Sequence, residues 1–78
     1  MTGKEVLDAS FMEMRWRVLS LAADLDRIRR APGSGKAMED PRILRLFEAM
    51  SILRSSEGNA AEQVQMIFSD KTLPPGRA

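Results

Sequence analysis

Seven apolar residues near the N-terminus recur at alternating steps of four and three positions. A strand places successive side chains on opposite faces, so residues with this spacing share one face only on a helix. The pattern therefore predicts one long α-helix over residues 3–30, built to press a continuous apolar seam against other helices. We call these residues the ladder: Leu7, Phe11, Met14, Val18, Leu21, Leu25 and Ile28.

Two positions qualify as the start of this helix, one near residue 3 and one near residue 11. Thr2 followed by Glu5 fits a capping box, in which each side chain hydrogen-bonds to the backbone N–H of the other residue. Ser10 followed by Glu13 fits the same motif and would leave the preceding residues as an arm. Because Leu7 is in register with the ladder, we favour the earlier start.

The end of the long helix is marked by Pro32 and Gly33, which interrupt helical backbone. Cations in a last turn interact favourably with the negative end of the helix dipole, and three arginines occupy that turn: Arg27, Arg29 and Arg30. Residues 32–39 are then expected to form a flexible loop. Lys36 follows a Gly-Ser-Gly sequence, but the earlier glycine and the following Ser or Thr of a phosphate-binding loop are missing.

A second helix is expected over residues 41–56. Asp40 and Pro41 give it an acidic N-cap followed by proline at the first helical position. Gly58 suits the residue with positive φ that ends a helix. The apolar residues of this helix repeat the ladder spacing, with Phe47 beside them: Ile43, Leu46, Met50 and Leu53.

A third, short helix is expected over residues 60–69. Asn59 and Glu62 have the spacing of another capping box. Two prolines and a glycine near the C-terminus predict a non-helical tail over residues 70–78. The apolar face of the third helix is expected to consist of Ala61, Val64, Ile67 and Phe68.

These elements predict an all-α fold for a single domain of residues 1–78, with the long helix packed antiparallel against the second. The third helix either continues the line of the second or folds over to cap an open end. A domain this small buries only about 60% of the surface of its unfolded chain and usually needs an additional staple. The sequence contains no Cys and no His, which excludes disulfides and argues against structural zinc. We therefore expect oligomerisation, as a dimeric helical bundle.

A second set of apolar residues lies on a different face of the long helix. A helix that is apolar on two sides is usually buried on two sides, and little of this short chain remains to cover both. We expect the set to form the interface of a homodimer, or to bind another protein, with Arg15 stacked on Trp16 or framing the contact. The alternative is a monomer in which the third helix or the tail covers Trp16. We call these apolar residues, together with the flanking Arg15, the Trp16 stripe: Met12, Arg15, Trp16, Leu19 and Ala23.

Composition narrows the classes of function. The formal net charge is +1, from 12 basic and 11 acidic residues, which argues against a protein that coats nucleic acid. No apolar run is long enough for a membrane span. Acidic residues on the polar side of the long helix argue against an amphipathic helix that lies on a membrane surface. Without His, Cys or Tyr, the usual proton-transfer and nucleophilic side chains are largely missing. We expect a cytoplasmic, non-enzymatic protein that holds no cofactor or metal.

Two short motifs resemble the all-helical chorismate mutases: Asp40-Pro41-Arg42 at a helix start, and Val64-Gln65-Met66-Ile67-Phe68 in the third helix. In that family, arginines and a lysine bind the two carboxylates of the substrate within an intertwined dimer, and a third-helix glutamine assists at the ether oxygen. The resemblance implies an arginine-clamp enzyme as an alternative function, with Gln65 in the place of that glutamine. The sequence departs from the family in the first turns of the long helix, where Lys4 is the one basic residue, and in the prolines that cut the third helix short.

A DNA-binding regulator is the second alternative. The turn before Asn59 joins two helices as a helix-turn-helix does, but the helix that would read DNA has no basic residue until Lys71. A simpler interpretation is that the arginines neutralise a helix end and nearby acids, as in the expected pairs Glu13–Arg17 and Asp26–Arg30. The basic residues that gather around the predicted loop are Arg27, Arg29, Arg30, Lys36, Arg42 and Arg45. Across the whole sequence, the function favoured is a small oligomerisation, adaptor or regulatory module.

Overall fold

The computed structural model describes residues 1–69, and within that range every regular element is a helix. The predicted non-helical tail over residues 70–78 lies outside the described residues. The chain divides into two compact units between Ser34 and Gly35, and each unit is described by itself. The helices, in chain order, are α1 (Gly3–Arg30), α2 (Ser34–Met38), α3 (Pro41–Ser55) and α4 (Ala60–Phe68).

The first unit is the long helix α1, of 28 residues. Its start is the earlier of the two expected ones: the Glu5 backbone N–H donates to Thr2 Oγ1 at 3.2 Å, and the Thr2 backbone N–H donates to Glu5 Oε1 at 2.7 Å. The capping box is therefore confirmed. At the other end, Ala31 is extended, with ψ of 153°, because the ring of Pro32 disfavours helical backbone in the preceding residue.

The loop predicted over residues 32–39 is wrong for its central part, because residues 34–38 form the short helix α2. Gly33 turns the chain with a positive φ of 79°, as expected. The segment after it contains Lys36, Ala37 and Met38, which are strong helix formers, and these outweigh the flexibility of Gly35.

Helix α3 begins as expected, with Pro41 at the first helical position and Asp40 as the N-cap. Asp40 Oδ1 accepts a hydrogen bond of 2.8 Å from the Arg42 backbone N–H. The helix is capped at Ser56, two residues before Gly58, which has a positive φ of 147°.

The capping box predicted at the start of α4 is wrong, because the Asn59 side chain makes no cap hydrogen bond. Its amide oxygen instead accepts from the Ser56 hydroxyl at 3.2 Å. The same Ser56 hydroxyl oxygen accepts from the Asn59 backbone N–H at 3.3 Å. Ser56 therefore engages the side chain that the sequence assigned to the cap.

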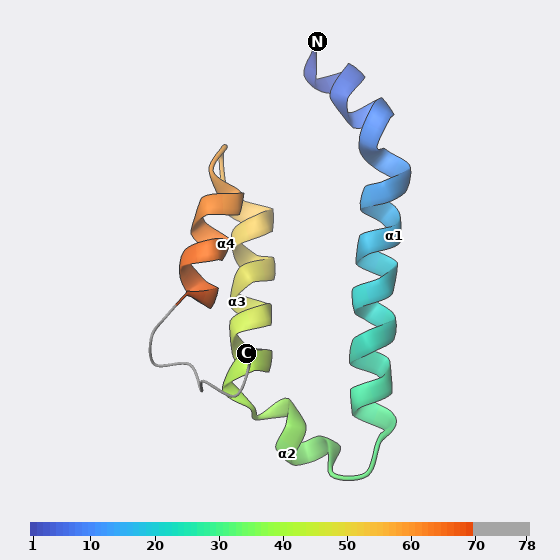
Figure 1. Cartoon of the computed structure of the whole chain (residues 1–78), viewed down its shortest axis with the longest axis vertical. Helices are drawn as coiled ribbons and strands as arrows, with labels where there is room; N and C mark the ends of the chain where they lie inside the picture. The colour runs from blue at the N-terminus through green and yellow to red at the C-terminus, as the bar shows by residue number, and fades with distance from the viewer. Residues whose placement is uncertain (70–78) are drawn as a thin grey trace. The chain divides into compact units, whose positions relative to one another are not determined.

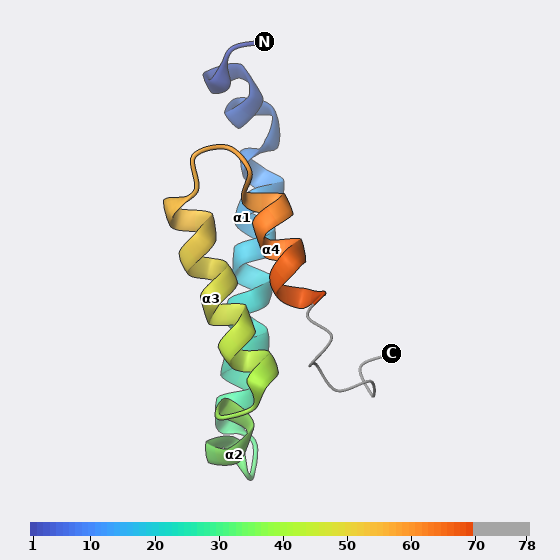
Figure 2. The same ribbon diagram turned by 90° about the vertical axis from the view of Figure 1, so that its left-hand side faces the viewer.

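In the second unit, α4 folds back beside α3 and runs in the opposite direction (Figures 1 and 2). It neither continues the line of α3 nor lies across its end. Ile43 and Ala49 of α3 are buried, at 6% exposure each. The less exposed face of α4 consists of Ala60, Val64 and Ile67.

The apolar face predicted for α4 is therefore only partly correct. Val64 and Ile67 are half-buried, but Ala61 and Phe68 are exposed, and Ala60 takes the place of Ala61 on the less exposed face. The antiparallel packing of the long helix against the second helix, and the dimeric bundle, stay predictions. No helix among residues 1–69 is both long enough and apolar enough to cross a bilayer.

Candidate interaction surface

The Trp16 stripe lies in the middle of α1, and all five of its residues are exposed. Trp16 and Met12 are each 60% exposed, and Leu19 is 43% exposed. The steps of four, three and four residues from Met12 to Ala23 place these apolar side chains along one side of the helix. The structure thus brings them together as a narrow apolar strip about three turns long.

Arg15 borders this strip and stacks on its largest member. The Arg15 Cζ atom lies 5.8 Å from the centroid of the Trp16 ring, which is within the range of a cation–π interaction. The sequence predicts that Arg15 either stacks on Trp16 or frames the contact, and a contact of the first kind is present. It leaves the indole largely exposed, so the guanidinium frames the strip and does not cover it.

The ladder lies on the other side of α1, and its two ends differ in the exposure of their side chains. Toward the C-terminal end of the helix, Leu21 and Ile28 are half-buried and Leu25 is buried. Toward the N-terminal end, the ladder side chains are exposed. We call this N-terminal part the exposed ladder: Leu7 (48% exposed), Phe11 (51%), Met14 (46%) and Val18 (68%).

The exposed ladder is a candidate surface that sequence reasoning missed, because the ladder was treated as one continuous seam. The difference in length between the helices could have indicated that part of the ladder stays exposed. At 1.5 Å per residue, a 28-residue helix is about 42 Å long, whereas the 15-residue α3 is about 22 Å long.

Polar flanks separate the two apolar faces of α1, and their charges pair within the helix. The expected Glu13–Arg17 pair is present at 3.0 Å, and the expected Asp26–Arg30 pair at 3.8 Å. Lys4 pairs with Asp8 at 2.9 Å, and Asp24 pairs with Arg27. All of these groups are exposed, so each pair contributes only a few tenths of a kcal/mol to helix stability.

The most tightly organised charged pair of the second unit is at the start of α3. Arg42 Nε donates to Asp40 Oδ1 at 2.9 Å, and Arg42 Nη2 donates to Asp40 Oδ2 at 3.0 Å. The side-chain and backbone hydrogen bonds from Arg42 lower the pKa of the Asp40 carboxyl to about 2. The same contact raises the pKa of the Arg42 guanidinium.

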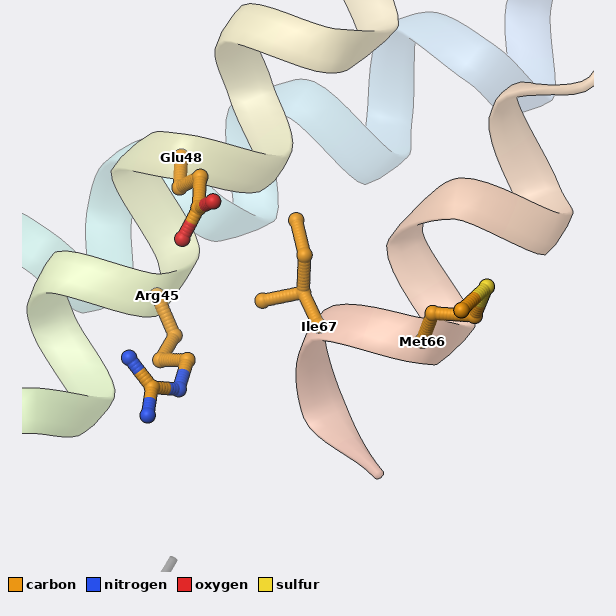
Figure 3. A pocket seen from close by; sticks show the side chains of 4 residues that line it. All are labelled: Arg45, Glu48, Met66 and Ile67. Carbon is orange, nitrogen blue, oxygen red and sulfur yellow. The ribbon is translucent and has the colours of Figure 1, made fainter. Parts of the chain in front are cut away.

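A small open pocket of about 310 Å³ lies between α3 and α4, where Arg45 and Glu48 of α3 face Ile67 of α4 (Figure 3). Met66 completes its lining. One cation, one carboxylate and two apolar side chains form no nucleophile–base arrangement. Gln65, the residue that the chorismate mutase resemblance assigns to the ether oxygen, is not part of this lining.

The arginines that suggested DNA binding are engaged locally. Arg27 and Arg30 pair with acids of α1, and Arg42 pairs with the N-cap of α3. These contacts agree with the simpler interpretation, in which the arginines neutralise nearby acids and a helix end. Among residues 1–69, no group of acidic, Cys or His side chains is arranged to hold a metal ion.

Comparison of the chain with protein families, with curated proteins and with solved structures finds no match. The case for a function therefore depends on the two apolar faces of α1 and on the chemistry of the second unit.

Proposed function

We propose that this chain is a small, non-enzymatic, cytoplasmic module that self-associates through α1, and that the Trp16 stripe is its contact surface. In this role the assembly acts as an oligomerisation, adaptor or regulatory unit. The homodimer is its simplest form, because a single patch that recognises itself gives a two-fold pair.

The observation that carries the proposal is the fold-back of α4 beside α3. Since α4 does not extend α3, the second unit offers a helix of about 22 Å, against about 42 Å for α1. The two apolar faces of α1 need more helical surface than that. A second chain is the simplest source of it.

The free energy available from burying the stripe is substantial. Trp16 is 60% exposed, so its exposed area is about 120 Å² if a tryptophan offers about 200 Å² in all. At about 25 cal/mol per Å², covering that area stabilises an assembly by about 3 kcal/mol. Met12 and Leu19 lie on the same strip and add to this. Arg15 supplies the polar edge that such a contact usually has.

The test is the mass in solution of the natural chain and of Trp16→Glu, measured by light scattering after gel filtration. The natural chain is expected at twice the monomer mass of 8.7 kDa or more. Trp16→Glu is expected to halve the mass, because it places a charge at the centre of the stripe.

Two controls separate the contact from a general effect of substitution. Trp16→Phe keeps an aromatic side chain in the stripe and should retain the natural mass. Leu44→Glu replaces an apolar residue of α3 that is 58% exposed, and should also retain the natural mass. A natural chain of 8.7 kDa, or a Trp16→Glu variant with the natural mass, contradicts the proposal.

A further inference from the structure

We propose that the exposed ladder is a second self-association surface, which packs against the exposed ladder of another copy of this chain in antiparallel orientation. This surface lies on the side of α1 away from the Trp16 stripe. The inference goes beyond the function proposed above, because it assigns a separate interface with a defined orientation and register.

The pattern of exposure gives the register. In an antiparallel pair of identical helices, the sequence numbers of two residues that face each other across the seam add up to a constant. This sum defines the register. With a sum of 25, Leu7 faces Val18 of the second copy, and Phe11 faces Met14 of the second copy. All four residues of the exposed ladder are then covered by one another, and all four are between 46% and 68% exposed in the single chain.

Charges beside the seam agree with this register. Asp8 follows Leu7, and Arg15 follows Met14, so both occupy the flanking position just after a seam residue. Residues at these positions pair across a coiled-coil interface and set its orientation. In the antiparallel register, Asp8 lies beside Arg15 of the second copy, and the two-fold symmetry repeats the pair. On the other flank, Ser10 lies beside Arg17 of the second copy, without a clash of charge.

Other arrangements fail to combine paired charges with a seam of exposed residues. Moving the register by one seam step, to a sum of 32, places Arg15 beside Arg15 and Arg17 beside Arg17 of the second copy. A further step, to a sum of 39, places Asp8 beside Arg29 and Arg17 beside Asp24 of the second copy, but it needs Leu25 in the seam, and Leu25 is only 8% exposed. A parallel pair in register places Asp8 beside Gly3 of the second copy, and forms no ion pair in this part of the helix.

The existing contacts of the two flanking residues are compatible with the new pair. Asp8 already accepts from Lys4 at 2.9 Å, but a carboxylate has acceptor sites for two cations. Arg15 Cζ lies 5.8 Å from the Trp16 ring centroid, and a guanidinium carries five N–H donors, so this contact leaves N–H groups to donate to Asp8 of the second copy.

The antiparallel register also suits the rest of the chain. It overlaps residues 3–22 of the two copies, a length of about 30 Å. The residues of α1 that follow position 22 then leave the pair at opposite ends, whereas in a parallel pair they would leave it at the same end.

The orientation can be tested by disulfide formation, because the natural chain contains no cysteine. Two variants, Leu7→Cys and Val18→Cys, are each made with Trp16→Glu so that the stripe contributes no association. They are mixed in equal amounts in a glutathione redox buffer, and the products are identified by intact mass. The antiparallel pair predicts the mixed disulfide as the main product.

The expected selectivity follows from disulfide geometry. A disulfide requires Cα atoms within about 7 Å, and positions 7 and 18 of a parallel pair lie 11 residues apart, about 16 Å along the helix. A parallel pair would therefore give only disulfides between like positions, and that result would overturn the proposal. A yield of mixed disulfide no higher than that of a Ser20→Cys variant with Trp16→Glu, whose thiol lies off the ladder, would also overturn it.

A charge reversal provides an independent check of the register. Adding Asp8→Arg to both cysteine variants should lower the yield of mixed disulfide, because it places two cations side by side. Adding Asp8→Arg together with Arg15→Asp should restore the yield. An unchanged yield in the single reversal contradicts the register. These outcomes are separate from the proposed function, which depends on the mass of the natural chain and of Trp16→Glu alone.

Discussion

Helix α1 and the α3–α4 hairpin follow the same local rules of helix formation, but they differ in how far their apolar side chains are buried. Both α1 and α3 begin at a capped residue, repeat apolar side chains at steps of three and four, and carry basic residues in the last turn. In the hairpin, a short turn brings α4 beside α3, and Ile43 and Ala49 are buried. In α1, Trp16 and Val18, on opposite faces, are at least 60% exposed.

The difference shows that apolar spacing identifies a face without identifying what covers it. In the hairpin, a neighbouring helix follows within a few residues of the same chain. Of the spaced apolar residues of α3, Ile43 is buried and Leu46 and Met50 are half-buried, whereas Leu53 is 62% exposed. Helix α1 has two apolar faces, and the remainder of the 78-residue chain is too short to cover both. Surplus apolar surface on a small chain is therefore the feature that points to association.

The largest expected effect is a difference in the free energy of unfolding between a substitution in the hairpin and one in α1. Ile43→Ala removes most of a buried side chain and should lower the free energy of unfolding by about 2–4 kcal/mol, from lost burial and the cavity left behind. Val18→Ala on α1 should lower the stability of the single chain by about 0.5 kcal/mol or less, because that side chain is 68% exposed. Urea unfolding followed by circular dichroism, at low protein concentration, measures both.

Leu44→Ala is the matched control, since Leu44 is adjacent to Ile43 in sequence and 58% exposed. It should cost much less than Ile43→Ala. Equal losses from Ile43→Ala and Leu44→Ala would contradict the assignment of the hairpin core. A loss from Val18→Ala that grows with protein concentration would show instead that Val18 is buried in an assembly, as the exposed ladder predicts.

A smaller effect is expected at the start of α1, where the structure depends on local contacts alone. Thr2→Ala removes the hydroxyl that accepts from the Glu5 backbone N–H, and should lower stability by about 1 kcal/mol. Amide hydrogen exchange should show the loss at the first turn of α1 and leave the hairpin unchanged. Ser10→Ala is the control, because the helix does not start there. Equal losses from the two variants would contradict the observed start.

Much of the fold was predictable because helix boundaries depend on residues close in sequence. The Thr2–Glu5 box, the Asp40 cap and the interruption at Pro32 each act within four residues, and the sequence displays them directly. Helix α2 was missed because five residues are too few to show a period, and two glycines suggested a loop. The predicted Asn59 cap is wrong because the Asn59 side-chain oxygen accepts a hydrogen bond from the Ser56 hydroxyl instead.

The candidate surfaces were predictable only in part. The Trp16 stripe follows from the spacing of its residues, and its stacking with Arg15 follows from their adjacency. The exposed ladder did not follow, because residue spacing gives the face of a helix and does not give the exposed fraction of each side chain on it. That α4 folds back beside α3 is a property of tertiary packing, and no residue spacing within α1 reports it.

The smallest expected effect concerns pH and the local pair at the start of α3. The pKa of Asp40 is lowered from 3.8 to about 2 in the folded chain by its hydrogen bonds with Arg42. A carboxyl whose pKa is depressed on folding stabilises the folded state above its unfolded pKa, and loses that contribution as the pH falls through the folded value. Thermal unfolding should therefore show a contribution from Asp40 that is complete above pH 4 and declines toward pH 2.

Asp40→Asn isolates this contribution, because asparagine is also a good N-cap but does not ionise. The natural chain should be more stable than Asp40→Asn at pH 5, and the difference in melting temperature should shrink toward pH 2. Arg42→Gln should shrink the difference at pH 5 as well, since the guanidinium is the main cause of the lowered pKa of Asp40. Because Arg42 is exposed and Asp40 is only half-buried, added salt should weaken the effect. A difference that stays constant from pH 5 to pH 2 would mean that the Asp40 carboxylate gains nothing from Arg42, and that the start of α3 depends on the cap geometry alone.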